Sequence, residues 1–203
     1  MNRPAQILMN EHRVIEQVLD CLEKMAERAR GDGALAIEDA RAAATFFRTF
    51  ADACHHGKEE DLLFPLLEQK NGLTPTEGPT AVMRMEHDKG RALVGSMIEA
   101  TDAYEAAEGA EGGALAAGDF ARAADEFIYL LRGHIQKEDT CLFPIAEDLL
   151  SAGEFAGLEA SFEAFERDGM GAGVHEGMLR EADRLARAWG VDAAAAGSGC
   201  CGH

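Results

Sequence analysis

Residues 55–65 read HHGKEEDLLFP and residues 134–144 read HIQKEDTCLFP, so the chain contains one pattern twice. In each copy a His is followed four residues later by a Glu, and the copy ends in Leu-Phe-Pro. A shorter match joins residues 11–12 to residues 86–87, which are both Glu-His. Internal repeats indicate duplicated supersecondary units. We therefore predict two similar helical hairpins, each carrying one lone His and one His-xxx-Glu pair.

The rest of the chain predicts helices and no strands. Ala, Leu, Glu, Arg and Met are frequent, and no stretch alternates polar and β-branched residues with period two. Gly and Pro clusters divide the chain into helical blocks. We expect long helices over residues 5–30, 37–70, 80–108 and 119–150, with links at 73–79 and 109–118, and shorter helices over 154–167 and 174–189.

This order of elements predicts an all-α fold, an up-down-up-down four-helix bundle with additional C-terminal capping helices. Residues 1–150 are expected to form the bundle, residues 151–190 to cap it within the same domain, and residues 191–203 to form a flexible tail. The tail contains Cys200, Cys201 and His203, which are soft-metal ligand types. Because no second cluster completes a site, we interpret this segment as a floppy end.

The His and Glu residues of the repeat fall on the inward face of each predicted helix. In the first helix, His12 shares an apolar stripe with Leu8, Ile15 and Leu19, at steps of three and four residues. The same rhythm places further side chains inward: His55, Glu59, Leu62 and Leu66, then His87, then His134, Glu138, Cys141 and Ile145. A buried Glu is costly without a compensating charge. The pattern therefore predicts a cation between the helices.

A His and a Glu four residues apart lie on one helical face and can reach one metal centre. Imidazole together with carboxylate suits iron, manganese or zinc. Two ions match the twofold repeat if each takes two His residues and the two Glu residues bridge them. The alternative is a structural bundle in which the same residues bind zinc or form hydrogen-bonded His–Glu pairs.

These motifs resemble the hemerythrin-like, or HHE cation-binding, family over roughly residues 5–150. The order His, His-xxx-Glu, His, His-xxx-Glu is similar to the di-iron ligand set of its bacterial members, including the iron-centre repair proteins. The resemblance implies two non-haem iron ions with an oxo or hydroxo bridge, Glu59 and Glu138 as bridging carboxylates, and this full ligand set: His12, His55, Glu59, His87, His134 and Glu138.

The sequence departs from oxygen-carrying hemerythrins in two places. Those proteins have a second His four residues after the third-helix His, and Arg91 stands there in this chain. They also use His-xxxx-Asp in the fourth helix, a spacing that Asp139 has, whereas Glu138 has the spacing of the repeat. The missing His favours a more open and reactive site. His175 could supply a fifth His if the capping segment folds over the bundle, although a surface or helix-capping role is our preferred interpretation.

Several neighbours of the predicted ligands are assigned other roles. His56 points about 100° away from His55 on an ideal α-helix, so we predict that it lies outside the ligand set, in supporting contacts or at the surface. Glu60 is expected to be solvated. Lys58 and Lys137 are expected to balance the acids next to them.

Composition restricts the partners and the location. The net charge is −18, from 37 acidic and 19 basic residues, which disfavours nucleic acid and anionic membranes as partners. Apolar runs are far shorter than a membrane span. The five Cys residues lack the spacing of a disulfide framework, and no signal peptide is visible. We expect reduced thiols and a cytoplasmic location.

The leading functional hypothesis is a di-iron protein that binds or reduces a small molecule: oxygen, nitric oxide or peroxide. Stress defence and iron-centre repair are the roles that the bacterial relatives imply, and as an enzyme it would be an oxidoreductase. The alternative is a di-iron sensor or binding module that acts through a partner protein, with the capping helices moving when the site fills.

Overall fold

The computed structural model describes residues 2–192, and the elements in that range are helical, with no strand among them. The predicted tail segment with Cys200, Cys201 and His203 lies outside the described residues. The helices, in chain order, are α1 (Arg3–Asp32), α2 (Ile37–Phe46), η1 (Phe47–His56), η2 (Glu59–Leu63), α3 (Phe64–Asn71), α4 (Gly78–Ala106), α5 (Ala110–Lys137), η3 (Glu138–Leu142), α6 (Phe143–Leu149), α7 (Ala152–Ala164), η4 (Phe165–Met170) and α8 (Val174–Trp189).

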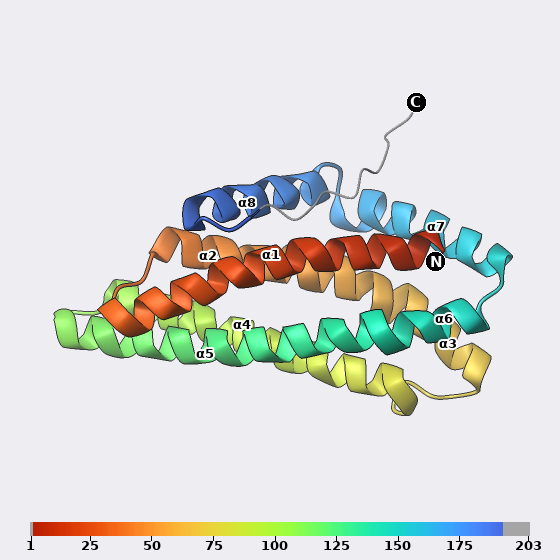
Figure 1. Ribbon diagram of the computed structural model, residues 1–203, viewed down its shortest axis with the longest axis horizontal. Helices are drawn as coiled ribbons and strands as arrows, with labels where there is room; N and C mark the ends of the chain where they lie inside the picture. The colour runs from red at the N-terminus through yellow and green to blue at the C-terminus, as the bar shows by residue number, and fades with distance from the viewer. Residues whose placement is uncertain (1, 193–203) are drawn as a thin grey trace.

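The predicted all-α bundle is confirmed. Four long arms lie side by side: α1, the run from α2 to α3, α4, and the run from α5 to α6 (Figure 1). α4 packs along α5, α5 packs along α1, and η1 contacts both α1 and α4. None of the helices in the described part of the chain is long and apolar enough to cross a membrane.

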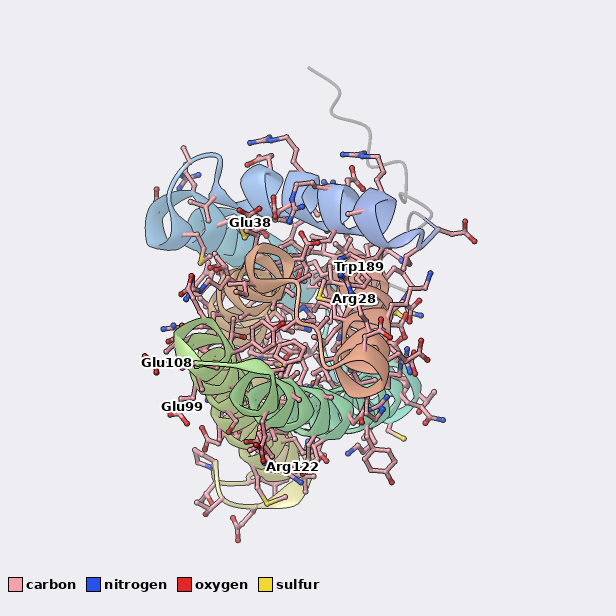
Figure 2. All side chains as sticks on the ribbon, turned by 90° about the vertical axis from the view of Figure 1, so that its left-hand side faces the viewer. Arg28, Glu38, Glu99, Glu108, Arg122 and Trp189 are labelled. Carbon is pink, nitrogen blue, oxygen red and sulfur yellow. The ribbon has the colours of Figure 1, made fainter. Side chains whose placement is uncertain are left out.

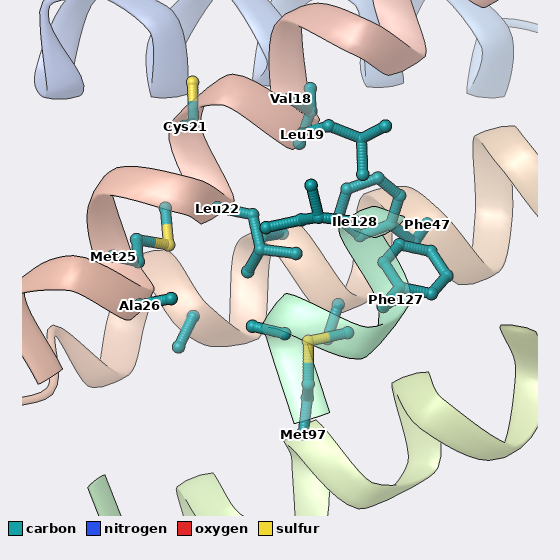
Figure 3. Close-up of a cluster of buried hydrophobic side chains, with 14 of the residues drawn as sticks. Val18, Leu19, Cys21, Leu22, Met25, Ala26, Phe47, Met97, Phe127 and Ile128 are labelled. Atoms are coloured by element: carbon teal, nitrogen blue, oxygen red, sulfur yellow. The ribbon is translucent and has the colours of Figure 1, made fainter. Parts of the chain in front are cut away.

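The apolar core fills the middle of the bundle. Leu19, Leu22 and Met25 of α1 meet Phe47, Met97 and Phe127 from the other arms, and all six are at most 5% exposed (Figure 3). Viewed along the bundle, charged side chains such as Glu99 and Arg122 lie on the outside (Figure 2). Burial of such large apolar side chains is the main favourable term in folding.

The last arm begins earlier than the sequence indicated. Residues 109–118 were expected to be a Gly-rich link, but α5 already starts at Ala110. This prediction was wrong because Ala116 and Ala117 bury against the core and favour helix, while Gly113 and Gly118 cost a helix only about 1 kcal/mol each. A tertiary contact thus outweighs a weak local preference.

Both copies of the repeat contain π-helical turns. The N–H of Phe64 bonds to the carbonyl of Glu59, and the N–H of Phe143 to that of Glu138, both five residues back. A π turn takes about one residue more than an α turn, and single π turns are frequent at functional sites. Pro65 and Pro144 follow at the start of α3 and α6, where a missing N–H is tolerated.

The extra residue moves the inward stripe by one position. Cys141 was predicted to face the core, but it is exposed and Leu142 is buried instead. Ile145 is likewise exposed while Ala146 is buried. In the first copy Leu63 and Leu67 take the buried positions expected for Leu62 and Leu66. The assignments of Cys141 and Ile145 were wrong, and Leu62 and Leu66 pack against the core only partly buried, because an α-helical period does not hold across a π turn.

Residues 152–189, here called the C-terminal cap, cover one side of the bundle. α7 starts with a capping box between Ser151 and Glu154. α7 contacts α1 and η2, η4 contacts η1, and α8 lies over α1 and α2 (Figure 1). The cap packs tightly against Gly57, where an added Cβ would lie 2.7 Å from the Cζ atom of Phe165.

Replacing Gly57 by Ala is expected to lower the free energy of unfolding by about 1 kcal/mol, because the Phe165 ring must move away. Gly133→Ala is the control, since Gly133 is also helical and has nothing within 4 Å of the added Cβ. That change is expected to stabilise the protein by about 0.5–1 kcal/mol. Urea unfolding of both variants measures the difference, and equal stabilisation by the two would show that the cap does not pack tightly here.

Candidate metal centre

The six predicted ligands converge in the interior of the bundle. His12 comes from α1, His55 and Glu59 from the second arm, His87 from α4, and His134 and Glu138 from the fourth arm, and each is at most 1% exposed. Four helices thus contribute polar groups to one buried point.

The histidines face one another in pairs through their Nε2 atoms. The two Nε2 atoms of His12 and His55 are 2.9 Å apart, and those of His87 and His134 are 3.1 Å apart. Each of these imidazoles has its Nδ1 atom against a carboxylate, which favours the N–H on Nδ1 and a lone pair on Nε2. Two lone pairs at such a distance repel unless a cation or a proton lies between them.

The two Glu residues span the pairs. Glu59 has Oε1 3.7 Å from Nε2 of His55 and Oε2 3.6 Å from Nε2 of His87. Glu138 Oε2 lies 3.1 Å from Nε2 of His12 and 3.2 Å from Nε2 of His134. Each carboxylate therefore reaches both pairs, as a bridging ligand must.

Several buried atoms at this point have no hydrogen-bond partner among the described residues. They are both carboxylate oxygens of Glu59, Oε1 of Glu138 and Nε2 of His56. Native proteins rarely leave buried polar atoms unsatisfied. Orphaned oxygen and nitrogen atoms that converge on one point are the donor set of a cation, so the residues fit a metal centre.

The donors form two groups, and within each group the possible ligand atoms all lie within 4.8 Å of one another. One group, here called the cap-side position, comprises His12, His55, Glu59 and Glu138. The other, the groove-side position, comprises His56, Glu59, His87 and His134. Imidazole and carboxylate donors in these numbers suit iron, manganese or zinc.

His56 lies in the buried interior, and its donor atom is one of the four groove-side atoms that could hold a metal ion. Of its two predicted places, the surface was wrong. Its side chain is buried and stacks on His87 with ring centroids 3.7 Å apart. The π-helical conformation of η1 brings two consecutive His residues into one interior. The doublet His55-His56 was the signal in the sequence, but a regular α-helix would have separated the two rings.

His175 lies away from both donor groups. Its Nδ1 atom is 3.2 Å from Oε2 of Glu166, and its ring packs against Phe50. The fifth His whose donor atom lies close to those of the predicted ligands is therefore His56 of the second arm.

A ring of carboxylates orients the four facing histidines. The Nδ1 atoms of His12, His55, His87 and His134 lie 2.7, 2.9, 2.6 and 3.0 Å from oxygens of Asp139, Glu11, Glu60 and Glu86, respectively. Such partners fix the tautomer and raise the basicity of a ligating imidazole. Glu60 was expected to be solvated, and this was wrong because His87 and Arg91 both hold it.

Each orienting carboxylate also has a cationic partner. Lys58 pairs with Glu11, Arg13 with Asp139, Arg91 with Glu60, and Lys137 with Glu86. Burial alone would raise the pKa of Glu11, but Lys58 and His55 lower this pKa to about 2. His87 and Arg91 likewise hold the pKa of Glu60 at about 2 despite burial. Glu11 and Glu60 therefore stay ionised at neutral pH.

The Phe residues of the two motifs stack on histidines across the bundle. Phe143 stacks on His12 with ring centroids 5.6 Å apart, and Phe64 stacks on His87 at 5.9 Å. Each Phe follows its motif Glu by five residues, so both π turns carry a ring to an equivalent place. The rings keep water from the imidazoles and limit their rotation.

The buried carboxyl groups of Glu59 and Glu138 have pKa shifts of opposite direction when no metal is present. Burial raises the pKa of Glu59, and the Glu138 carboxylate raises it further. Burial also acts on Glu138, but His134 and His12 lower its pKa. Burial alone would lower the pKa of His134, but Glu138 and Glu86 raise this pKa to about 9. Metal binding must displace protons from this cluster.

An open groove leads to the groove-side position. Its cavity has a volume of about 530 Å³ between η1, α4 and α5. The inner end carries His56 and His87, and the walls include Phe47, Val94 and Phe127. The groove therefore offers a small molecule a path from solvent to the groove-side position, past apolar walls and charged residues such as Asp52 and Arg91.

The chain matches the family described as hemerythrin HHE cation binding domain over residues 3–146. It belongs to this family. The matched range contains all six predicted ligands and His56, so the centre lies wholly inside the hemerythrin HHE domain.

Among curated proteins, the chain is similar to uncharacterized proteins of Mycobacterium tuberculosis and Mycobacterium bovis. It is 29% identical to each over 184 residues, which cover 91% of this chain and 69% of the relative. No solved structure gives a significant match.

Two positions separate this HHE chain from the oxygen-carrier pattern. Arg91, where the resemblance would place a second His, points to carboxylates and forms ion pairs with Asp52, Glu60 and Asp88. Asp139, which has the oxygen-carrier spacing, contacts Nδ1 of His12. Asp139 therefore orients a ligand, and Glu138 faces the centre.

Proposed function

We propose that this protein holds two iron ions and binds or reduces oxygen, nitric oxide or peroxide. The observation that carries the proposal is the pair of donor groups that share Glu59, with orphaned buried oxygens between them. An iron pair bound there would supply one-electron redox changes and open coordination positions for a small molecule. Stress defence or iron-centre repair is the proposed cellular role.

The residues around the centre would have different roles. Glu59 and Glu138 would hold the two ions together, since each reaches both His pairs. The carboxylates on the Nδ1 atoms would keep the imidazoles oriented through a change of metal charge. His56 and His87 stand where the groove ends, so the small molecule would arrive beside them.

We further propose that the protein works in the cytoplasm. The free thiols of Cys21, Cys54 and Cys141 support a reducing compartment. Burial raises the pKa of the Cys54 thiol to about 12, so this group stays protonated at neutral pH when no metal is bound.

Anaerobic reconstitution followed by metal analysis tests the proposal. We expect about two iron ions per chain, a near-ultraviolet and visible absorption that bleaches on reduction, and reaction of the reduced protein with nitric oxide or peroxide within seconds. His134→Ala should lose the band. Tyr129→Ala is the control, because Tyr129 is exposed on the same helix. A wild-type chain that binds only zinc, or binds no metal, would end the di-iron proposal.

A further inference from the structure

The two halves of the centre have unequal surroundings although their motifs repeat. Lys58 and Lys137 occupy equivalent places, each just before a bridging Glu, and each pairs with the carboxylate that orients a His. The Lys58 side chain is 0% exposed, whereas the Lys137 side chain is 44% exposed. The Lys58 side of the centre is therefore shielded from solvent, whereas the Lys137 side is exposed.

The C-terminal cap makes this difference. Glu166 of η4 accepts a hydrogen bond from Lys58 at 2.7 Å, and its other oxygen lies 3.2 Å from Nδ1 of His175. The ammonium group of Lys58 also lies over the Phe162 ring, 5.6 Å from its centroid. An unbroken chain of polar contacts therefore runs from His175 through Glu166, Lys58 and Glu11 to His55.

The groove-side position has no such cover. Glu86, which orients His134, pairs with half-exposed Lys137 and itself lines the α4 groove. The cap helices have no residue among those that line this groove. On the cap side, Glu166 pairs with Lys58. No residue of the cap, 152–189, makes an equivalent contact with Glu86 or Lys137 on the groove side.

We propose that Lys58 is a positioning residue through which the C-terminal cap locks the cap-side metal, leaving the groove-side metal as the exchangeable one that meets the small molecule. This inference rests on the proposed two-metal function. Lys58 forms ion pairs with two carboxylates, Glu11 in the bundle and Glu166 in the cap. The orientation of His55 therefore depends on how the cap packs.

The chemistry explains why the lock acts through Lys58. Without its ammonium group, Glu11 would be a buried carboxylate with only His55 as a partner, and removing one member of a buried ion pair is strongly destabilising. Glu11 would then rotate toward water or take up a proton, and Nδ1 of His55 would lose its fixed acceptor. Loss of such an outer partner typically weakens metal binding by about 10- to 100-fold.

The test is a competition titration of the full-length protein with cobalt(II) against a chelator, which gives two dissociation constants. Lys58→Met should raise one constant by about 10- to 100-fold, and Lys137→Met should change both by less than about threefold because its site is solvated. Glu166→Gln should give a smaller effect in the same direction as Lys58→Met. Glu163→Gln, an exposed change on the neighbouring turn of the cap, should give none.

Double variants identify the position that weakens. Lys58→Met with His87→Ala should bind no cobalt tightly, and Lys58→Met with His55→Ala should still bind one ion. Equal effects of Lys58→Met and Lys137→Met, or no effect of Lys58→Met and Glu166→Gln in a wild type that binds two ions, would overturn the inference. A wild type that binds no cobalt or iron would instead overturn the proposed function. If Lys58→Met fails to fold, Glu166→Gln against Glu163→Gln decides the question.

Discussion

Replacing Glu59 by Met is expected to stabilise the metal-free protein while abolishing high-affinity metal binding. Among residues 2–192, neither buried oxygen of Glu59 has a hydrogen-bond partner, and the Glu138 carboxylate raises the pKa of this carboxyl group. Removing an unsatisfied buried polar group relieves a penalty of about 1–3 kcal/mol. Met has a similar volume and flexible packing, so the cavity stays filled.

Urea unfolding in the presence of a chelator measures this effect. The midpoint of Glu59→Met should rise above that of the wild type, whereas in the presence of metal the order should reverse. Glu126→Met, a substitution at an exposed position, should change the free energy of unfolding by less than about 0.5 kcal/mol. A lower midpoint for metal-free Glu59→Met would show that Glu59 is satisfied without a cation and would count against the metal centre.

The second large effect is expected at His56. His56→Leu should remove a donor from the groove-side position and weaken metal binding there by about 100-fold or more, since a direct ligand matters more than an outer partner. Its stacking on His87 would be lost as well. His175→Leu is the matched control, because His175 contacts Glu166 and neither donor group includes it.

Cobalt(II) titration with absorption spectroscopy distinguishes the two variants. We expect His56→Leu to change the visible spectrum and the affinity of the groove-side ion, and His175→Leu to leave that ion unchanged. If both variants bind the groove-side ion as the wild type does, His56 is a stacked neighbour of His87 and the centre uses four histidines.

The sequence predicted the architecture well because the repeat and the apolar stripes are local signals. The stripe around His12 extends over α1, where the helix is regular, and its core residues were correctly placed. The stripes failed after Glu59 and Glu138, where π turns shift the register by one residue. Such turns have no clear signature in composition, so the exposure of Cys141 was missed, and the π-helical η1 likewise concealed the burial of His56.

The carboxylates and cations that surround the predicted ligands were harder to predict than the ligands themselves. The Glu-His pairs at residues 11–12 and 86–87 were visible as a repeat, but their carboxylates orient histidines on other arms. Such cross-bundle contacts depend on how the helices are rotated, which spacing along one helix does not determine. The burial of Lys58 could not be foreseen, because it requires the cap to fold back from more than a hundred residues away along the chain.

The π turns have a consequence for anyone who would transplant this centre. Placed on straight α-helices at the same spacings, His56 would rotate out of the interior, and the stacking of Phe64 and Phe143 on the histidines would be lost. A designer would need to copy the irregular backbone along with the side chains, including the Pro that follows each Phe. In the same way, deleting one residue between Glu138 and Phe143 would turn all of α6 by about 100° relative to α5.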